Sequence, residues 1–186
     1  MSEHKAPPEL AGRESGPTVP VGPALSPAKN QGSSDQDQRT TLAGQPVVVT
    51  LPIQWGDQDA FGHVNGVVYF RWFETARVEY LNRSGLGHLM SKERMGPILA
   101  AIKCDYRRQL KHPDTILVSA SITEIGRSSM KMRHLIYSQS QQAIAAEGES
   151  TVVMFDYANQ RPTRVPDDVR QQIERLEGAI GRVQQA

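Results

Sequence analysis

The sequence predicts an α+β fold, in which a five-stranded antiparallel sheet wraps around one long central helix. Three features of the 186-residue chain predict it: one alternating apolar segment, a long helical segment after it, and four further alternating segments in succession. Strands joined by short turns favour an antiparallel meander. A lone helix with a broad apolar surface has to cover the apolar side of that sheet. The expected order is strand, long helix, four strands and a short closing helix.

The first strand and the long helix follow from hydrophobic spacing. Apolar side chains alternate over 47–55, and Pro52 within that run indicates an edge strand or a bulge. A helix is expected over 67–83, closed by Ser84 and Gly85. Its first apolar stripe consists of Tyr69, Trp72, Phe73, Ala76 and Tyr80, and a second stripe consists of Phe70, Glu74, Arg77 and Leu81. Two stripes indicate a helix that is covered on two sides, which a dimer joining two sheets edge to edge would explain.

The chain divides into a tail, a compact domain and a closing helix. Seven of the twelve prolines lie at or before Pro46, and no aromatic residue precedes it, so residues 1–44 are predicted to be a disordered and passive tail. The compact domain is expected over 45–165, with its later strands near 98–106, 116–122, 130–136 and 143–157. The closing helix, 166–186, has an apolar stripe for packing or subunit contact that consists of Val169, Ile173, Leu176, Ile180 and Val183.

Composition narrows the classes of partner and compartment. With 21 basic and 20 acidic side chains, the formal net charge is +1, which gives no argument for a nucleic-acid partner or a charged membrane surface. The single cysteine, Cys104, cannot form an internal disulfide and fits a reducing compartment. No apolar run approaches the roughly 20 residues that span a bilayer, and the N-terminus lacks the apolar region of a secretory signal. We expect a cytoplasmic protein without membrane insertion.

The turn between the first strand and the long helix carries the groups best suited to chemistry. It holds Asp57, Asp59, His63 and Asn65 immediately before the helix start at Gly66. Helix N-termini leave backbone N–H groups unpaired and carry partial positive charge. Such amides can hold the oxyanion of an acyl-transfer reaction, while a nearby carboxylate attacks the carbonyl or activates water.

Each of these side chains also has a purely structural explanation. An aspartate before a helix is commonly only a cap. Asp57 lies nearer the end of the strand and is the better candidate for capping the turn, whereas Asp59 is the better candidate for chemistry. His63 on its own would more often hold the turn by a hydrogen bond, and Asn65 would serve as a helix N-cap. The five histidines are scattered, so no metal site is expected, and Cys104 is interpreted as a small core residue.

The same segment resembles the signature of the 4-hydroxybenzoyl-CoA thioesterase family. The likeness is carried first by 55–69 and 73–77, and it continues in order through later stretches, so that it covers about residues 46–175. Those later stretches are 104–108, 125–129, 148–150 and 156–166. The resemblance implies a hotdog fold, a homodimer or homotetramer with active sites at a dimer interface, and hydrolysis of an acyl-CoA thioester without a cofactor.

Site residues carried over from this resemblance fall into two groups. Asp59 matches the catalytic aspartate, and Gly66 falls where a helix amide polarises the thioester carbonyl. His63 and Asn65 would line the pocket, and Glu74 would have a supporting role, with Arg77 as a potential partner. The residues expected to meet the CoA part of the substrate are Arg127, Ser128, Ser129 and Arg161. Many family members carry Asn where this chain has Gly66, and Pro where it has Gln109; neither change removes a reacting group.

Two other functions stay open at this point. A hotdog dehydratase acting on hydroxyacyl thioesters would place a histidine with an acid at the reacting carbon, and His63 with Glu74 could imitate that pair. A non-catalytic module would bind acyl-CoA without turnover and use the tail to reach a partner. The sequence leaves open the acyl group, the choice between dimer and tetramer, and whether Asp59 acts covalently or as a general base.

Overall fold

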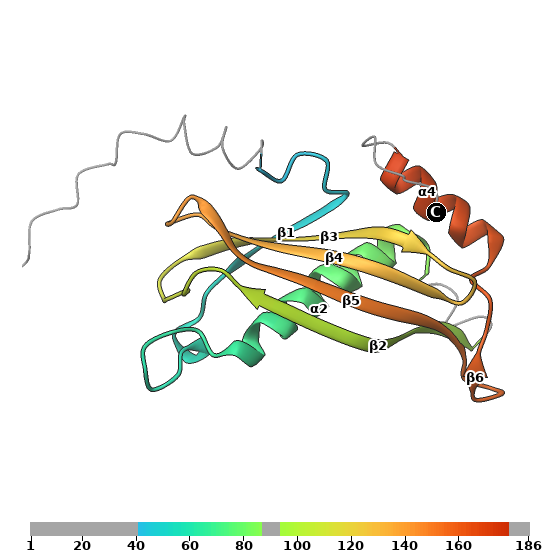
Figure 1. The fold of residues 1–186 in the computed structure, drawn as a ribbon, viewed down its shortest axis with the longest axis horizontal. Coiled ribbons are helices and arrows are strands. Elements are labelled where there is room, and N and C mark those ends of the chain that lie inside the picture. Colours follow the sequence, from blue (N-terminus) through green and yellow to red (C-terminus); the bar gives the residue numbers. More distant parts are fainter. Residues whose placement is uncertain (1–40, 87–93, 179–186) are drawn as a thin grey trace, which may run out of the picture.

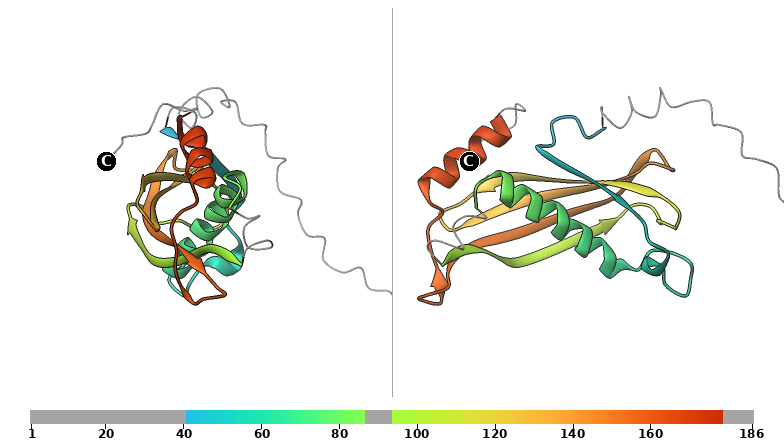
Figure 2. Two further views of the ribbon diagram at one scale, coloured as in Figure 1. Left: turned by 90° about the vertical axis from the view of Figure 1, so that its right-hand side faces the viewer. Right: turned by 180° about the vertical axis from the view of Figure 1, so that it is seen from behind.

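The computed structural model describes residues 41–86 and 94–178. The elements in chain order are β1 (Val47–Pro52), a 3-10 helix (Trp55–Asp57), α2 (Gly66–Arg83), β2 (Met95–Tyr106), β3 (Thr115–Ile125), β4 (Ser129–Ser138), β5 (Ala143–Asp156), β6 (Arg161–Pro162) and α4 (Asp167–Gly178). The sheet curves around α2, and α4 lies near one end of it (Figures 1 and 2). The predicted architecture of a sheet wrapped around one long helix, with a short closing helix, is confirmed.

The strand order corrects one expectation. The sheet runs β1-β3-β4-β5-β2, with β6 added to β5, so the last three long strands form a meander but β2 pairs with β5 rather than β3. The connection over 107–114 therefore crosses from β2, at one edge of the sheet, to β3, which lies next to the strand at the opposite edge. It is held on the way by hydrogen bonds from Val64 N to Leu110 O (2.9 Å) and from Ile53 N to Asp114 O (2.9 Å). A short crossing is possible because the curved sheet brings its two edges toward the same side of α2 (Figure 2).

Both edge strands carry proline. Pro52 lies in β1, as its position in the sequence indicated, and Pro97 lies in β2. Proline cannot donate a ladder hydrogen bond, so an edge is where a strand tolerates it best. No described residue pairs with β2 on its outer side.

The first stripe of α2 forms the centre of the core, as predicted. All five of its members, from Tyr69 to Tyr80, are buried. Gly148 of β5 allows the sheet to approach α2 closely, because a Cβ there would lie 2.5 Å from the Phe73 ring. The helix ends at the predicted place: Ser84 is its C-cap, and Gly85 has a φ of +77°, the left-handed conformation that glycine adopts most readily.

The two ends of the chain are described only in part. Residues 1–40 of the predicted tail lie outside the described residues, while 41–44 form a turn in which Leu42 packs against the sheet. In α4, Val169 and Ile173 are buried, and Glu177 accepts hydrogen bonds from Tyr80 Oη and Ile122 N, both at 2.6 Å. These contacts fit the packing interpretation of its stripe, whose last two members lie in 179–186, outside the described part.

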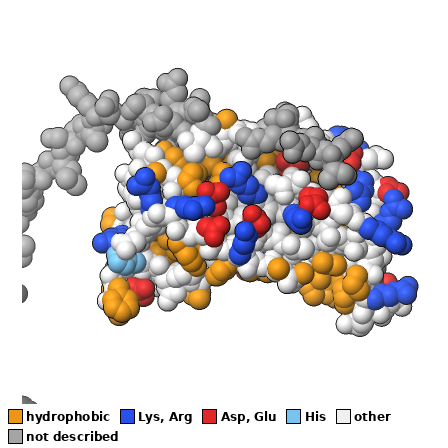
Figure 3. Space-filling view, viewed as in Figure 1, with side chains coloured by type: hydrophobic (Ala, Val, Ile, Leu, Met, Phe, Trp, Pro, Cys, Tyr) orange, Lys and Arg blue, Asp and Glu red, His pale blue; other side chains and the backbone are white. Residues whose placement is uncertain are grey.

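The outer face of the sheet is highly charged. Cross-strand pairs there include Lys103 with Glu149 and Arg133 with Glu147, and blue and red side chains alternate across it (Figure 3). Such a face is well solvated. Among the described residues, no helix has both the length and the apolar character needed to cross a membrane.

Candidate active site

Asp57 holds the turn that precedes α2. Its buried carboxylate accepts a hydrogen bond from Gln54 N (2.8 Å) and forms an ion pair with Arg71. Its carbonyl oxygen accepts a hydrogen bond from the backbone N–H of Asn65 (2.9 Å), the residue just before the helix. Asp57 thus joins the end of β1, the first helical turns and the intervening loop, in agreement with its interpretation as the capping aspartate.

Asp59 begins a tight loop that ends at His63, and hydrogen bonds between the two residues close this loop. Its Oδ1 accepts a hydrogen bond from Phe61 N at 2.9 Å and a longer one from His63 N at 3.4 Å. The Asp59 N–H in turn donates to His63 O (2.8 Å). Among the described residues, Oδ2 accepts no hydrogen bond. One carboxylate oxygen therefore orders the loop, while the other is available to a substrate or to water.

The start of α2 leaves one backbone donor available. Asn65 is the N-cap, as predicted: its Oδ1 accepts from Val67 N (3.1 Å), and its carbonyl oxygen accepts from Val68 N (2.9 Å). Of the first three helical amides, only that of Gly66 has no acceptor among the described residues. A helix N-terminus also concentrates partial positive charge at this point. The sequence led us to expect an oxyanion to be held by the amides near Gly66 and Val67; of these two, only the Gly66 N–H is without an acceptor among the described residues.

A cavity of about 290 Å³ opens beside Gly66. Its wall is formed by His63, Val64, Gly66, Tyr69, Tyr106, Arg107, Arg108, Gln109 and Leu110. Two of the predicted site residues, His63 and Gly66, therefore line one cavity. Asp59, Asn65 and Glu74 do not line it in the single chain, although Asp59 and Asn65 lie in the same loop.

Two tyrosines in this wall have no counterpart among the predicted site residues. Tyr106, half exposed at the end of β2, donates from its hydroxyl to Gly66 O (3.0 Å), and its ring meets that of Tyr69 edge-on at 4.9 Å. Burial raises the pKa of Tyr69 to about 12, and burial also raises the pKa of Tyr106, so both remain neutral donors. The alternating pattern in the sequence predicted that Tyr106 lies on a strand. Its contact with Gly66 at the helix start depends on the curvature of the sheet, which that pattern does not describe.

Glu74 and Arg77 lie further along α2 and differ sharply in exposure. The Glu74 side chain is 63% exposed, and its Oε1 is 3.7 Å from Arg77 Nη2. Arg77 is buried, its pKa is lowered by burial, and its Nη1 has no hydrogen-bond partner. Among the described residues this guanidinium nitrogen has no acceptor, which is costly for a buried cation.

The residues expected to meet CoA lie at the opposite end of the sheet. Ser129 pairs with Val153, and Arg161 pairs with Asp156, which itself pairs with Met95 at the start of β2. The helix start, by contrast, contacts the far end of β2 through Tyr106. Arg127 and Ser128 occupy the turn between β3 and β4, near the same end as Ser129. One chain alone does not bring this group to the cavity.

Comparisons with known proteins agree with this fold. A thioesterase from Thermus thermophilus, solved with coenzyme A and zinc, is 31% identical; the alignment covers 73% of this chain and 96% of that one, with a TM-score of 0.65. The long-chain acyl-CoA thioesterase FadM of Escherichia coli is 21% identical over 118 residues, covering 63% of this chain and 89% of FadM. YsmA of Bacillus subtilis is 26% identical over 85 residues, covering 46% of this chain and 56% of YsmA, so the match spans only about half of that relative.

A family profile extends the likeness over most of the described domain. The profile of the Thioesterase-like superfamily matches residues 53–173, which is well over half of the chain and includes the loop, α2 and the whole sheet after β1. The chain therefore belongs to the Thioesterase-like superfamily of thioester hydrolases and has its hotdog fold.

Proposed function

We propose that the protein hydrolyses an acyl-CoA thioester to a free acid and CoA. The observation that carries the proposal is the cavity at the start of α2, where the unpaired Gly66 N–H lies in the wall and the Asp59 loop adjoins it. The coenzyme A bound by the similar Thermus protein, and the name of FadM, support CoA as the thiol carrier. The resemblance over 55–77 supports a place near the 4-hydroxybenzoyl-CoA thioesterases.

In the proposed mechanism, the Gly66 N–H binds the thioester oxygen as it gains negative charge. Asp59 either takes a proton from water, which adds to the carbonyl carbon, or itself attacks that carbon to form an anhydride that water then hydrolyses. In both routes the C–S bond breaks, and the CoA thiolate leaves and is protonated. The hydrogen bond from Phe61 N to Oδ1 would aim the remaining oxygen, Oδ2, at the substrate.

A homodimer would complete the site. The outer edge of β2 exposes Ile98 and Leu99, each 40% exposed, and no described residue pairs with that edge. Antiparallel pairing of two β2 strands would bring the partner's copy of the 127–129 turn and of Arg161 to the start of this chain's α2. We propose this dimer as the active unit, with His63, Asn65 and Glu74 in supporting roles; the charged outer sheet face disfavours stacking of sheets into a tetramer.

Replacement of Asp59 by asparagine tests the catalytic proposal. Asparagine keeps an oxygen that can accept from Phe61 N but removes the negative charge, so the loop is retained while catalysis is lost. We expect Asp59→Asn to lower kcat/KM by about 100-fold or more, measured as thiol release from a panel of acyl-CoAs. Asp168→Asn, an exposed carboxylate on α4, is the matched control and should behave as the wild type.

Two outcomes would refute hydrolysis at this site. One is a wild-type protein that releases no CoA from any acyl-CoA in the panel, which would favour a binding module. The other is an Asp59→Asn variant with unchanged rate and unchanged melting temperature. The dehydratase alternative requires His63 and Glu74 at one carbon, but only His63 lines the cavity. Product analysis distinguishes a dehydratase from a thioesterase, because a dehydratase forms an unsaturated thioester and no free thiol.

A further inference from the structure

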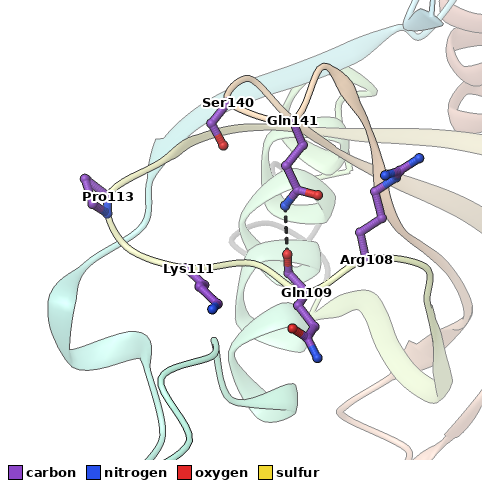
Figure 4. Close-up of a pocket in the computed structure, with 6 residues that line it drawn as sticks. All are labelled: Arg108, Gln109, Lys111, Pro113, Ser140 and Gln141. Atoms are coloured by element: carbon purple, nitrogen blue, oxygen red, sulfur yellow. Dashed lines mark hydrogen bonds between the residues drawn. The ribbon is translucent and has the colours of Figure 1, made fainter.

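A second, larger hollow adjoins the cavity at the start of α2. Its volume is about 530 Å³, and it is lined by Arg108, Gln109, Lys111, Pro113, Ser140 and Gln141 (Figure 4). Four of these residues come from the connection between β2 and β3, and two come from the turn between β4 and β5. Arg108 and Gln109 also line the first cavity. The two spaces therefore share a wall, and we call the second one the basic hollow.

The backbone around the basic hollow is held in place from both sides. Gln141 Nε2 donates to Gln109 O (2.7 Å), which joins the two segments across the hollow (Figure 4). Arg108 N donates to Ala145 O (3.0 Å), and Ser140 N donates to Asp114 Oδ1 (3.0 Å). The shape of the hollow is thus held by hydrogen bonds between its two segments.

The basic hollow contains two cationic side chains, and the Asp114 carboxylate that holds Ser140 at its wall does not line it. Neither Arg108 nor Lys111 forms an ion pair with any described residue, whereas the adjacent Arg107 pairs with Glu147. No carboxylate lines the hollow. The two cations lie on either side of the Gln109–Gln141 hydrogen bond (Figure 4). Unpaired cations at two separate positions suit a ligand that carries more than one anionic group.

We propose that the basic hollow binds the phosphate groups of the CoA part of the substrate. This rests on the proposed function, because the hollow opens beside the thioester cavity, and a thiol carrier that leaves it along the shared wall meets Arg108. Phosphates are the anions for which guanidinium and ammonium groups are best suited. Binding then involves Arg108 and Lys111 of the chain that also supplies the Gly66 amide.

Direct binding to the full-length protein tests the proposal. Calorimetric titrations use CoA and pantetheine, which has the same thiol arm without phosphates. We expect Arg108→Ala/Lys111→Ala to weaken CoA binding by about 10-fold or more, as the loss of charge-assisted hydrogen bonds implies, and to leave pantetheine binding unchanged. The control Lys103→Ala/Lys131→Ala removes two exposed charges from the outer sheet face and should bind CoA as the wild type does. A further titration with dephospho-CoA, which lacks the 3′-phosphate, shows how much of the affinity comes from the 3′-phosphate and how much from the diphosphate.

The proposal is overturned if the double variant in the basic hollow binds CoA as tightly as the wild type. It is equally overturned if pantetheine loses affinity to the same extent. Hydrolysis assays test the proposed thioesterase activity independently of the proposed phosphate binding in the basic hollow. An active wild type with unaltered CoA affinity in the variant refutes only the basic hollow, and an inactive wild type that binds CoA through Arg108 and Lys111 refutes only hydrolysis.

Discussion

Gly66 begins the long helix without a side chain, and Tyr106 occupies the space that a side chain would take. A Cβ built at Gly66 lies 2.9 Å from the Tyr106 hydroxyl and 3.4 Å from the ring carbon that carries it. The hydroxyl itself donates to Gly66 O (3.0 Å). The one unpaired amide of the helix start is therefore positioned by a residue that is 40 positions away in the sequence.

The contact between Gly66 and Tyr106 can be tested by changing both residues, first singly and then together. Gly66→Ala forces the tyrosine hydroxyl and the helix start apart, and displacement of the proposed oxyanion donor should lower kcat/KM by about 10- to 100-fold. Tyr106→Phe in the same chain removes the atom at 2.9 Å, so it should restore part of the activity that Gly66→Ala loses. Thiol-release kinetics on the single and double variants provide the measurement.

Gly178→Ala is the control, because nothing lies within 4 Å of a Cβ at that position. An additive double variant, with no recovery by Tyr106→Phe, would mean that the steric contact with Tyr106 does not govern the role of Gly66.

At the scale of elements, His134 joins three strands and the central helix. It lies fully buried on β4, where Nε2 is 3.0 Å from Ser150 Oγ on β5 and Nδ1 is 3.3 Å from Ser119 O on β3. Its ring stacks on Phe73 of α2 with centroids 4.9 Å apart. Burial, with a smaller contribution from the charge of Arg77, lowers the His134 pKa to about 4, so the core holds a neutral imidazole.

Protonation of the unfolded chain should therefore make stability depend on pH. The folded pKa is depressed, so the unfolded state takes up the proton first as the pH falls below about 6.5. Stability is complete above that value and is lost progressively toward pH 4. Urea denaturation should show a loss of about 2 kcal/mol in unfolding free energy between about pH 7.5 and about pH 5 from this group alone.

His134→Gln should reduce that pH dependence, whatever its effect on stability at neutral pH. His112→Gln replaces an exposed histidine and should leave the pH dependence as it is in the wild type. A pH profile that is the same in all three proteins would exclude His134 as the group responsible.

At the scale of the whole molecule, the unpaired outer edge of β2 predicts assembly. Exposed strand edges pair readily unless charge or cover prevents it, and this edge has apolar side chains at Ile98 and Leu99. We expect Ile98→Lys/Leu99→Lys to convert a dimer to a monomer in size-exclusion chromatography with light scattering. The rate of thiol release should fall when the dimer is lost, while the circular dichroism spectrum remains that of the native fold.

Thr123→Lys adds a charge at an exposed position on β3 and serves as the control. A wild-type protein that is monomeric and fully active at assay concentration would contradict both the β2 interface and a site shared between two chains.

The sequence by itself determined the elements, because their signals are local: strand alternation, helical stripes, the Asn65 cap and the Gly85 stop each depend on a few neighbouring residues. The capping function of Asp57 was likewise readable from its position in the turn. Resemblance to a known family also indicated the hotdog architecture that the structure has.

Only the tertiary structure decided which elements meet. The curved sheet separates β2 from β3, brings Tyr106 to Gly66, and sets the 127–129 turn at the far end of the sheet from the cavity. It also assembles the basic hollow from two segments that no local pattern connects. Strand order and loop crossings depend on contacts between residues distant in the chain, and periodicity carries no information about those contacts.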